Sequence, residues 1–319
     1  MKRLIIYIFV VTGVSCIVSA VFYFNLYRLE IKKKTYVNKT FSYIRHSVEK
    51  NDILFVGSSR VWVHIDPVKI EKQTGLRAYN LALDGSGLPE HRAMIARYLK
   101  IHPAPKFIVL NVDFLCFDAW HETYNFPEYF HLMNDSVIGR YLKPYNVKYR
   151  SSPRKIVYAL KWLSSMPDED KLASLFKQQH FDVDAYKSYK GFNPVNRMWD
   201  KEAVEKLKLK FKPNLTPEGF RIFNDIVSIC NQKNIKLIAV IAPFYKKYTS
   251  IVINAKESMN KIKLACKKKR VKVWDLSTLP LSDTTLYFYN STHLNAKGAA
   301  IYTDSLSQRI KKEIGVGQH

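Results

Sequence analysis

Five short apolar runs, separated by segments with helical character, constrain the fold of this sequence more than any other feature. Uninterrupted apolar runs of this length are typical of parallel strands that helices cover on both faces. Strands that alternate with helices build an α/β domain with a parallel sheet. We therefore predict five parallel strands at residues 52–57, 77–82, 107–112, 237–241 and 271–274.

Helix signals lie between these runs and after the last of them. Thr216, Pro217 and Glu218 form an N-cap, a proline at the first helical position and an acid in the first turn. Asn295 is placed to cap the last helix. With further helices at 87–100 and 254–269, the pattern predicts a three-layer α/β/α sandwich around a five-stranded, flavodoxin-like sheet.

One long interval interrupts the alternation of strands and helices. The third run ends near Asp113 and the fourth begins only near Lys236, and the residues between are rich in aromatic side chains. We predict a mostly helical insertion at about 114–214, with helical patches at 153–165 and 200–210, that covers one end of the sheet. The domain division is then 1–34 for the N-terminal segment and 35–319 for the α/β domain, within which 35–50 form a polar connecting helix.

The N-terminal segment carries no charged residue from 4 to 27. A helix needs about 20 apolar residues to cross a bilayer, so this run is long enough for an uncleaved, single-pass anchor in the lipid. A cleaved signal peptide is the alternative, but the apolar run continues past the poor cleavage sequence at Ser19 and Ala20. Basic residues flank both ends of the run, so charge alone does not fix its orientation.

The charge balance is strongly basic. Lys and Arg number 51 against 27 Asp and Glu, a net charge of +24, and the basic residues cluster at 201–212 and 256–272. No zinc-finger spacing, RNA-binding motif or helix-turn-helix pattern accompanies them, so we expect no nucleic acid partner. Beside a membrane anchor, an anionic lipid or polymer is the expected counterpart, and a merely solvated helix face is the alternative.

Two polar segments lie where a parallel sheet binds its ligands, beyond the carboxyl ends of strands. The first apolar run leads directly into Gly57, Ser58, Ser59 and Arg60, a tight turn that can present the Ser59 hydroxyl. His293 precedes the cap of the last helix, on a loop beyond the sheet. A histidine there could take a proton from a serine across the site.

Together these two segments resemble the SGNH/GDSL hydrolase superfamily. The likeness extends over residues 50–113 and 215–310 and is closest to the membrane-anchored branch that includes the D-alanyl-lipoteichoic acid transfer and alginate O-acetylation proteins. It implies that Ser59 is the nucleophile and His293 the base. It also implies that Gly85, after the second strand, donates a backbone N–H to the oxyanion, with Asn111 a further candidate donor.

The sequence departs from the superfamily pattern at the acid position, three residues before the histidine, where Asn290 stands. An asparagine can orient an imidazole but adds no charge. Three readings stay open: a slow enzyme with Asn290 in the triad, an enzyme that recruits another acid such as Asp283, and a chain that has lost catalysis.

The resemblance implies a serine esterase or O-acyltransferase, membrane-anchored and outside the cytoplasm, that acts on a cell-envelope polysaccharide or other polymer. Such proteins work with a membrane-bound O-acyltransferase partner in polysaccharide O-acetylation. The alternative is a non-catalytic accessory protein that binds an anionic polymer or the acyltransferase. A soluble-substrate esterase on a tether is a third reading. The sequence has no metal-ligand spacing and no phosphate-binding loop, so we expect no metal and no cofactor.

Overall fold

The computed structural model describes residues 2–32, 36–117, 123, 129–146, 189–200 and 210–315. Its centre is a five-stranded sheet in the order β2-β1-β3-β4-β5, in which every neighbouring pair is parallel. This order is the flavodoxin-like one, so the sequence-based prediction of the sheet is confirmed. The strands are β1 (Ile53–Val56), β2 (Ala78–Asn80), β3 (Phe107–Asn111), β4 (Lys236–Ile241) and β5 (Lys272–Asp275).

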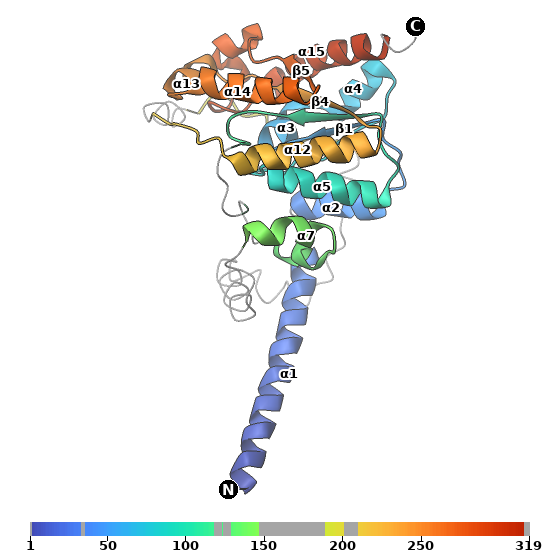
Figure 1. Cartoon of the computed structure of the whole chain (residues 1–319), viewed down its shortest axis with the longest axis vertical. Coiled ribbons are helices and arrows are strands. Elements are labelled where there is room, and N and C mark those ends of the chain that lie inside the picture. Colours follow the sequence, from blue (N-terminus) through green and yellow to red (C-terminus); the bar gives the residue numbers. More distant parts are fainter. Residues whose placement is uncertain are drawn as a thin grey trace.

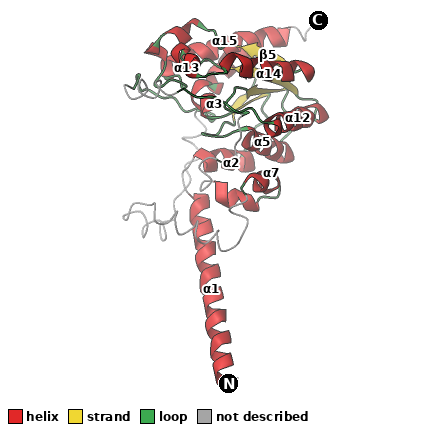
Figure 2. Cartoon of the chain, turned by 60° about the vertical axis from the view of Figure 1, so that its left-hand side comes forward, coloured by secondary structure: helices red, strands yellow, loops and turns green. Residues whose placement is uncertain are grey.

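The strands alternate their side chains between two cores, one on each face of the sheet. Leu54 and Val56 of β1 point into the first core, whereas Ile53 and Phe55 point into the second. Because successive side chains of a strand face opposite ways, a strand that is apolar at every position must be covered on both sides. Figure 2 shows the strands in yellow between helices, as this requires.

Two groups of helices complete the cores. The first core takes side chains from α2 (Tyr36–His46), α5 (Leu88–Ile101), α12 (Pro217–Gln232) and α14 (Ala255–Lys268), and the second from α3 (Ser59–His64), α4 (Pro67–Thr74) and α15 (Ala296–Gly315). Figure 1 shows α2, α5 and α12 on one side of the sheet and α4 and α15 on the other. The domain is therefore a three-layer sandwich.

The predicted capping signals begin helices at the expected residues. Thr216 accepts a hydrogen bond from the Gly219 backbone N–H at the start of α12. Asn295 accepts one from the Gly298 N–H at the start of α15. Each side chain satisfies a backbone donor that the first helical turn leaves without a partner. The short elements of the remaining loops are η1 (Phe130–Asn134), α7 (Ile138–Leu142), η2 (Lys143–Tyr145), α13 (Lys246–Ile251), η4 (Pro280–Asp283) and η5 (Thr285–Tyr287).

The N-terminal segment forms the long helix α1 (Lys2–Lys32), which projects from the α/β domain in Figure 1. From Leu4 to Val21 its described side chains include a series of exposed large apolar residues. A search of the described residues finds no helix that is both long and apolar enough to cross a membrane.

The described parts of the insertion lie partly beside α5 and partly across the carboxyl edge of the sheet. The predicted helical patch at 153–165 and the residues 201–209 of the second patch fall outside the described residues. Residues 189–200, which we call the edge segment, are held by backbone hydrogen bonds from the Asn80 N–H to Lys190, from the Asn193 N–H to Trp62 and from the Ala296 N–H to Val195. These bonds place the edge segment at the carboxyl ends of the strands.

Gly191 lets the edge segment approach β2 closely. Its φ is +85°, and a Cβ atom there would lie 2.0 Å from the Asn80 carbonyl oxygen. Only glycine adopts this conformation without cost and also leaves room for the neighbouring backbone. Gly191 thus fixes where the edge segment crosses the end of the sheet.

Candidate active site

The turn after β1 places Ser59 at the first position of α3. A Cβ atom on Gly57 would meet Val61 Cγ2 at 2.4 Å and Asn111 Cβ at 3.1 Å, so only glycine lets the chain turn this tightly beside β3. Ser58 is the residue before the helix, and its carbonyl accepts the N–H groups of Val61 and Trp62. The Ser59 side chain is consequently held at the carboxyl edge of the sheet.

The structure brings Ser59 and His293 together although 234 positions separate them. Ser59 Oγ lies 2.7 Å from His293 Nε2. A buried histidine, His64, holds the loop in place because its Nε2 accepts the Leu294 backbone N–H at 2.9 Å. A serine hydroxyl at hydrogen-bond distance from an imidazole is the arrangement of a nucleophile and its base.

Asn290 lies on the opposite side of the His293 ring, with its Oδ1 2.9 Å from Nδ1. The same oxygen accepts the backbone N–H groups of Thr292 and His293, at 3.0 and 2.9 Å. These two donors identify the atom that faces the ring as oxygen, so Nδ1 carries the proton and donates it. The Nε2 lone pair then faces the hydroxyl of Ser59, which is the tautomer that a general base requires.

Asp283 does not supply the acid. Its carboxylate forms an ion pair with Lys246 at 2.9 Å on the surface, and the side chain is 60% exposed. Since Nδ1 of His293 faces Asn290, the reading in which Asp283 completes the triad does not fit the structure.

The environment of His293 disfavours its charged form. Burial, reinforced by the guanidinium groups of Arg60 and Arg197, lowers its pKa to about 4, and Asp113 opposes them. The imidazole is therefore neutral, and competent as a base, over the whole neutral range. The imidazolium that forms during proton transfer has no carboxylate partner at Nδ1.

Arg60 and Asp113 form a buried ion pair behind the site, 2.5 Å apart. Burial alone would raise the pKa of Asp113, but Arg60 and the Cys116 backbone N–H outweigh it and lower the pKa. Arg60 also donates to the carbonyls of Ala242 and Pro243, and its guanidinium lies over the Phe244 ring at 3.5 Å. The pair thus links the ends of β3 and β4 to the turn that carries Ser59.

The prediction that Asn111 is an oxyanion donor is not supported by its placement. The side chain is fully buried, and its Nδ2 donates to Asp113 at 2.9 Å. Its direction is set by the Arg60–Asp113 pair, which the β3 sequence alone does not reveal.

Gly85, which the resemblance places with Ser59 at the oxyanion, has a φ of +61°. A neighbouring side chain that the sequence analysis missed, Asp84, contacts both residues. Burial raises the pKa of Asp84, and hydrogen bonds with the Gly85 backbone and the Ser59 side chain partly offset this. A charged carboxylate here would oppose an oxyanion, whereas the neutral acid would offer it an O–H donor.

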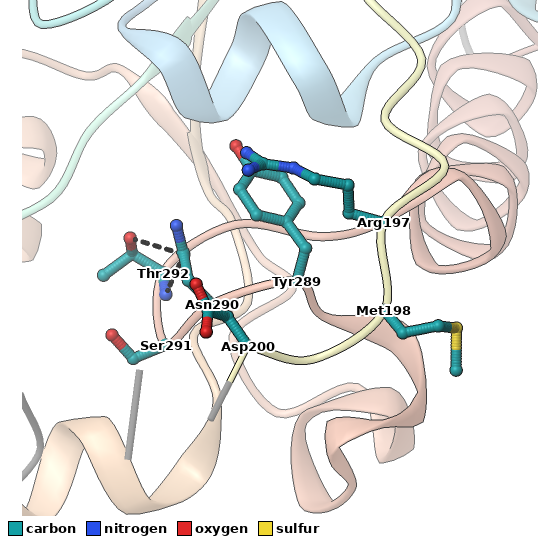
Figure 3. Close-up of a pocket in the computed structure, with 7 residues that line it drawn as sticks. All are labelled: Arg197, Met198, Asp200, Tyr289, Asn290, Ser291 and Thr292. Carbon is teal, nitrogen blue, oxygen red and sulfur yellow. Dashed lines mark hydrogen bonds between the residues drawn. The ribbon is translucent and has the colours of Figure 1, made fainter. Parts of the chain in front are cut away.

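A cavity of about 560 Å³ adjoins the His293 loop. Figure 3 shows the side chains around it, which come from the edge segment and from residues 289–292. Tyr289 stacks on His293 with ring centroids 5.4 Å apart. Arg197 was not predicted, because the edge segment carries no recognisable motif. Tyr289 lies in the segment before His293, but the sequence pattern indicates no role for it.

No group of histidine, cysteine, aspartate or glutamate side chains within the described ranges could hold a metal ion. The three cysteines of the α/β domain, Cys116, Cys230 and Cys266, are free and buried. They pack as small apolar residues.

No protein-family model and no curated protein matches this chain. Some solved structures match it at low identity and low structural similarity. A GDSL-like lipase from Bacteroides thetaiotaomicron is 10% identical with a TM-score of 0.40, covering 88% of this chain and 100% of its own. A carbohydrate acetylesterase family member from Sinorhizobium meliloti is 8% identical with a TM-score of 0.39, covering 83% and 99%.

A family two carbohydrate esterase from Clostridium thermocellum, in complex with cellohexaose, is 8% identical with a TM-score of 0.38, covering 85% of this chain and 67% of its own. Identities and scores this low carry no inference about the activity of the chain. Any functional assignment therefore rests on the site itself.

Proposed function

We propose that this chain is an SGNH-type serine esterase or acyl-transferring enzyme that acts on a cell-envelope polysaccharide or polymer. The observation that carries the proposal is the hydrogen-bonded series Ser59–His293–Asn290 at the carboxyl edge of the sheet. The two sequence segments that resemble the superfamily supply these three residues, and the parallel sheet has the strand order that the resemblance implies.

The geometry permits a two-step acyl transfer. Ser59 Oγ attacks the ester carbonyl while its proton moves to His293 Nε2, and the oxyanion forms near the Ser59 and Gly85 backbone. The alcohol leaves with the proton from His293, and an acyl-serine remains. Water or a sugar hydroxyl then attacks the acyl-serine, with His293 again as base, and regenerates Ser59. The choice of second acceptor decides between hydrolysis and transfer.

A fluorophosphonate probe and a small acetyl ester test the proposal directly. The probe should label Ser59, identified by peptide mass spectrometry, and the protein should release acetate from 4-nitrophenyl acetate and from an O-acetylated polysaccharide. Absence of both labelling and turnover would favour the alternative function, that of a non-catalytic accessory protein. That reading has support in the uncharged Asn290 and in the exposed Lys267, Lys268 and Lys269 at the end of α14. Reversing these three charges should then impair polymer binding, whereas Ser59→Ala should not.

Asn290→Asp should raise kcat/KM for a small ester by about 10- to 100-fold, because a carboxylate stabilises the imidazolium of His293. The gain is smaller than the roughly 10⁴-fold Asp-to-Asn loss known in a protease, where the asparagine favours the wrong tautomer. In this chain the Asn290 oxygen already faces Nδ1 and holds the correct tautomer. An unchanged or lower rate with retained folding would show that charge at this position does not limit the reaction.

The pH profile gives a second readout of the same pair. Since the pKa of His293 is lowered to about 4, the unprotonated base persists and the rate should stay level from neutral pH down to about that value. A carboxylate in place of the Asn290 amide would raise the pKa of His293, so the acid limb of Asn290→Asp should move to higher pH. Activity measured from pH 3 to pH 8 in buffers of constant ionic strength would reveal the shift, and overlapping acid limbs would contradict the assigned role.

We further propose that the uncharged N-terminal run anchors the chain in the membrane, with the α/β domain outside the cytoplasm and beside a membrane-bound O-acyltransferase. The support for the anchor is the absence of charge from 4 to 27, and the support for the orientation is the resemblance to membrane-anchored proteins. A Lys311→Cys variant carrying Cys16→Ser should react with a membrane-impermeant maleimide in intact cells, because Lys311 is exposed on α15. Reaction only after lysis would reverse the orientation.

A further inference from the structure

The cavity beside the His293 loop is connected to the catalytic imidazole through two stacked groups. The Arg197 guanidinium carbon lies 4.9 Å from the centroid of the Tyr289 ring. That ring in turn stacks on His293, with an interplanar angle of 11°. Figure 3 shows the Arg197 guanidinium beside the hydroxyl end of Tyr289. A charge bound at Arg197 is therefore one aromatic ring away from the base.

Arg197 is exposed to the cavity and pairs with no carboxylate among the residues that the structure places. In Figure 3, Asp200, the acid that shares the cavity, is well separated from the Arg197 guanidinium. Arg197 also donates a hydrogen bond to the Tyr289 hydroxyl, and its remaining N–H groups can bind a planar anion.

The charges around His293 are not balanced. Arg60 and Arg197 act on it from the α3 and edge-segment sides, and the buried Asp113 opposes them. Asp84 faces Ser59 and interacts with Tyr289. Asn290 supplies an oxygen at Nδ1 but no charge. Proton transfer from Ser59 therefore creates a cation next to two guanidinium groups.

We propose that this cavity binds an anionic group of the substrate, a carboxylate or a phosphate, through Arg197, and that the bound anion supplies the negative charge that Asn290 lacks. The proposal rests on the proposed function, because it names the substrate class of the same site. The cavity of about 560 Å³ is large enough for a sugar unit that carries such a group.

The physical effect on the base has a definite direction. Arg197 is one of the groups that lower the pKa of His293 to about 4. An anion paired with Arg197 cancels this contribution, raises the pKa of the imidazole and stabilises the imidazolium in the transition state. An uncharged ester does not cancel the Arg197 charge. The site therefore favours anionic esters over neutral ones in reaction rate as well as in binding affinity.

The first experiment follows the His293 ring by NMR and needs no turnover. Titration from pH 3 to pH 8 at constant ionic strength should give a higher pKa in sodium phosphate or sodium acetate than in sodium chloride. Arg197→Gln should abolish the difference and Arg197→Lys should retain part of it. Arg309→Gln removes the same charge from an exposed position on α15 and should leave the difference intact. Identical titrations in the three salts would overturn the proposal.

The second experiment compares matched sugar esters. Acetylated galacturonic acid and acetylated glucose 6-phosphate carry an anion, whereas acetylated galactose does not. Arg197→Gln should lower kcat/KM for the preferred anionic ester by about 10- to 100-fold, the loss expected for an interaction made in the transition state. The same variant should leave kcat/KM for the neutral ester equal or higher, because the lost guanidinium no longer lowers the pKa of His293. The ester that shows the larger loss identifies carboxylate or phosphate as the natural group.

The two experiments separate failure of this inference from failure of the proposed function. Equal losses on charged and neutral esters would overturn the anion site while leaving the esterase in place. If no ester is turned over and phosphate still raises the pKa of His293, the anion site stands and the proposed function fails.

Discussion

Ser59→Ala should abolish acyl-enzyme formation and lower the esterase rate by at least about 10³-fold, because removing the nucleophile of a catalytic triad costs up to roughly 10⁶-fold. The hydroxyl lies 2.7 Å from the base that would activate it, and alanine leaves His293 with nothing to deprotonate. The measurement is intact-protein mass spectrometry after brief reaction with an acetyl ester. An adduct of acetyl mass should form on the unaltered chain and be absent from the variant.

Ser58→Ala is the matched control. It makes the same change one residue earlier, at a position whose side chain makes no capping hydrogen bond. The adduct and most of the rate should persist in this variant. Because α3 begins at Ser59, thermal unfolding of both variants should be compared so that a folding defect is recognised. A Ser59→Ala protein that folds normally and retains its rate would exclude Ser59 as nucleophile.

His293→Ala should have the second largest effect, a loss of about 10³-fold or more in kcat, because the unassisted serine hydroxyl is a weak nucleophile at neutral pH. Its backbone N–H still donates to Asn290, and its carbonyl still accepts from Tyr289, so the loop keeps these bonds after truncation. Added imidazole should restore part of the activity by filling the space that the ring leaves.

Rescue distinguishes the base from a packing residue. A rate recovered in proportion to the concentration of the neutral form of imidazole assigns proton transfer to His293. His293→Gln fills much of the same space without a titratable group and should stay inactive, which makes it the control for packing. A variant that keeps activity within a few fold would contradict the role.

The strands could be predicted because the signal of a buried strand, a short run of apolar residues, lies within the strand itself. Four apolar residues in a row, as in β1, leave only a strand covered on both faces, and the two cores bear this out. The starts of α12 and α15 were likewise readable, since Thr216 and Asn295 cap through groups a few residues away. Ser59 and His293 could be predicted because each lies in a recognisable motif. Ser59 follows the first predicted strand, and His293 precedes the last predicted helix.

The rest depends on contacts that the local sequence does not encode. Asn111 turns toward Asp113 because Arg60 arrives there from another strand end. Arg197 reaches the site only because Gly191 and the backbone bonds of the edge segment carry it across the sheet. Asp84 is one residue from the predicted Gly85, yet its contact with Ser59 depends on the turn geometry of both strands.

The 234 positions between Ser59 and His293 also have a consequence for biosynthesis. Contacts so distant in sequence form late, because a long loop must close before they contribute. His293 is brought to Ser59 only when α15 has packed against α3 and α4. A growing chain that has folded through β4 already displays the serine turn but holds no base beside it. If Ser59 is the nucleophile, as we propose, its hydroxyl stays without a base during synthesis and gains one only when the sandwich is complete.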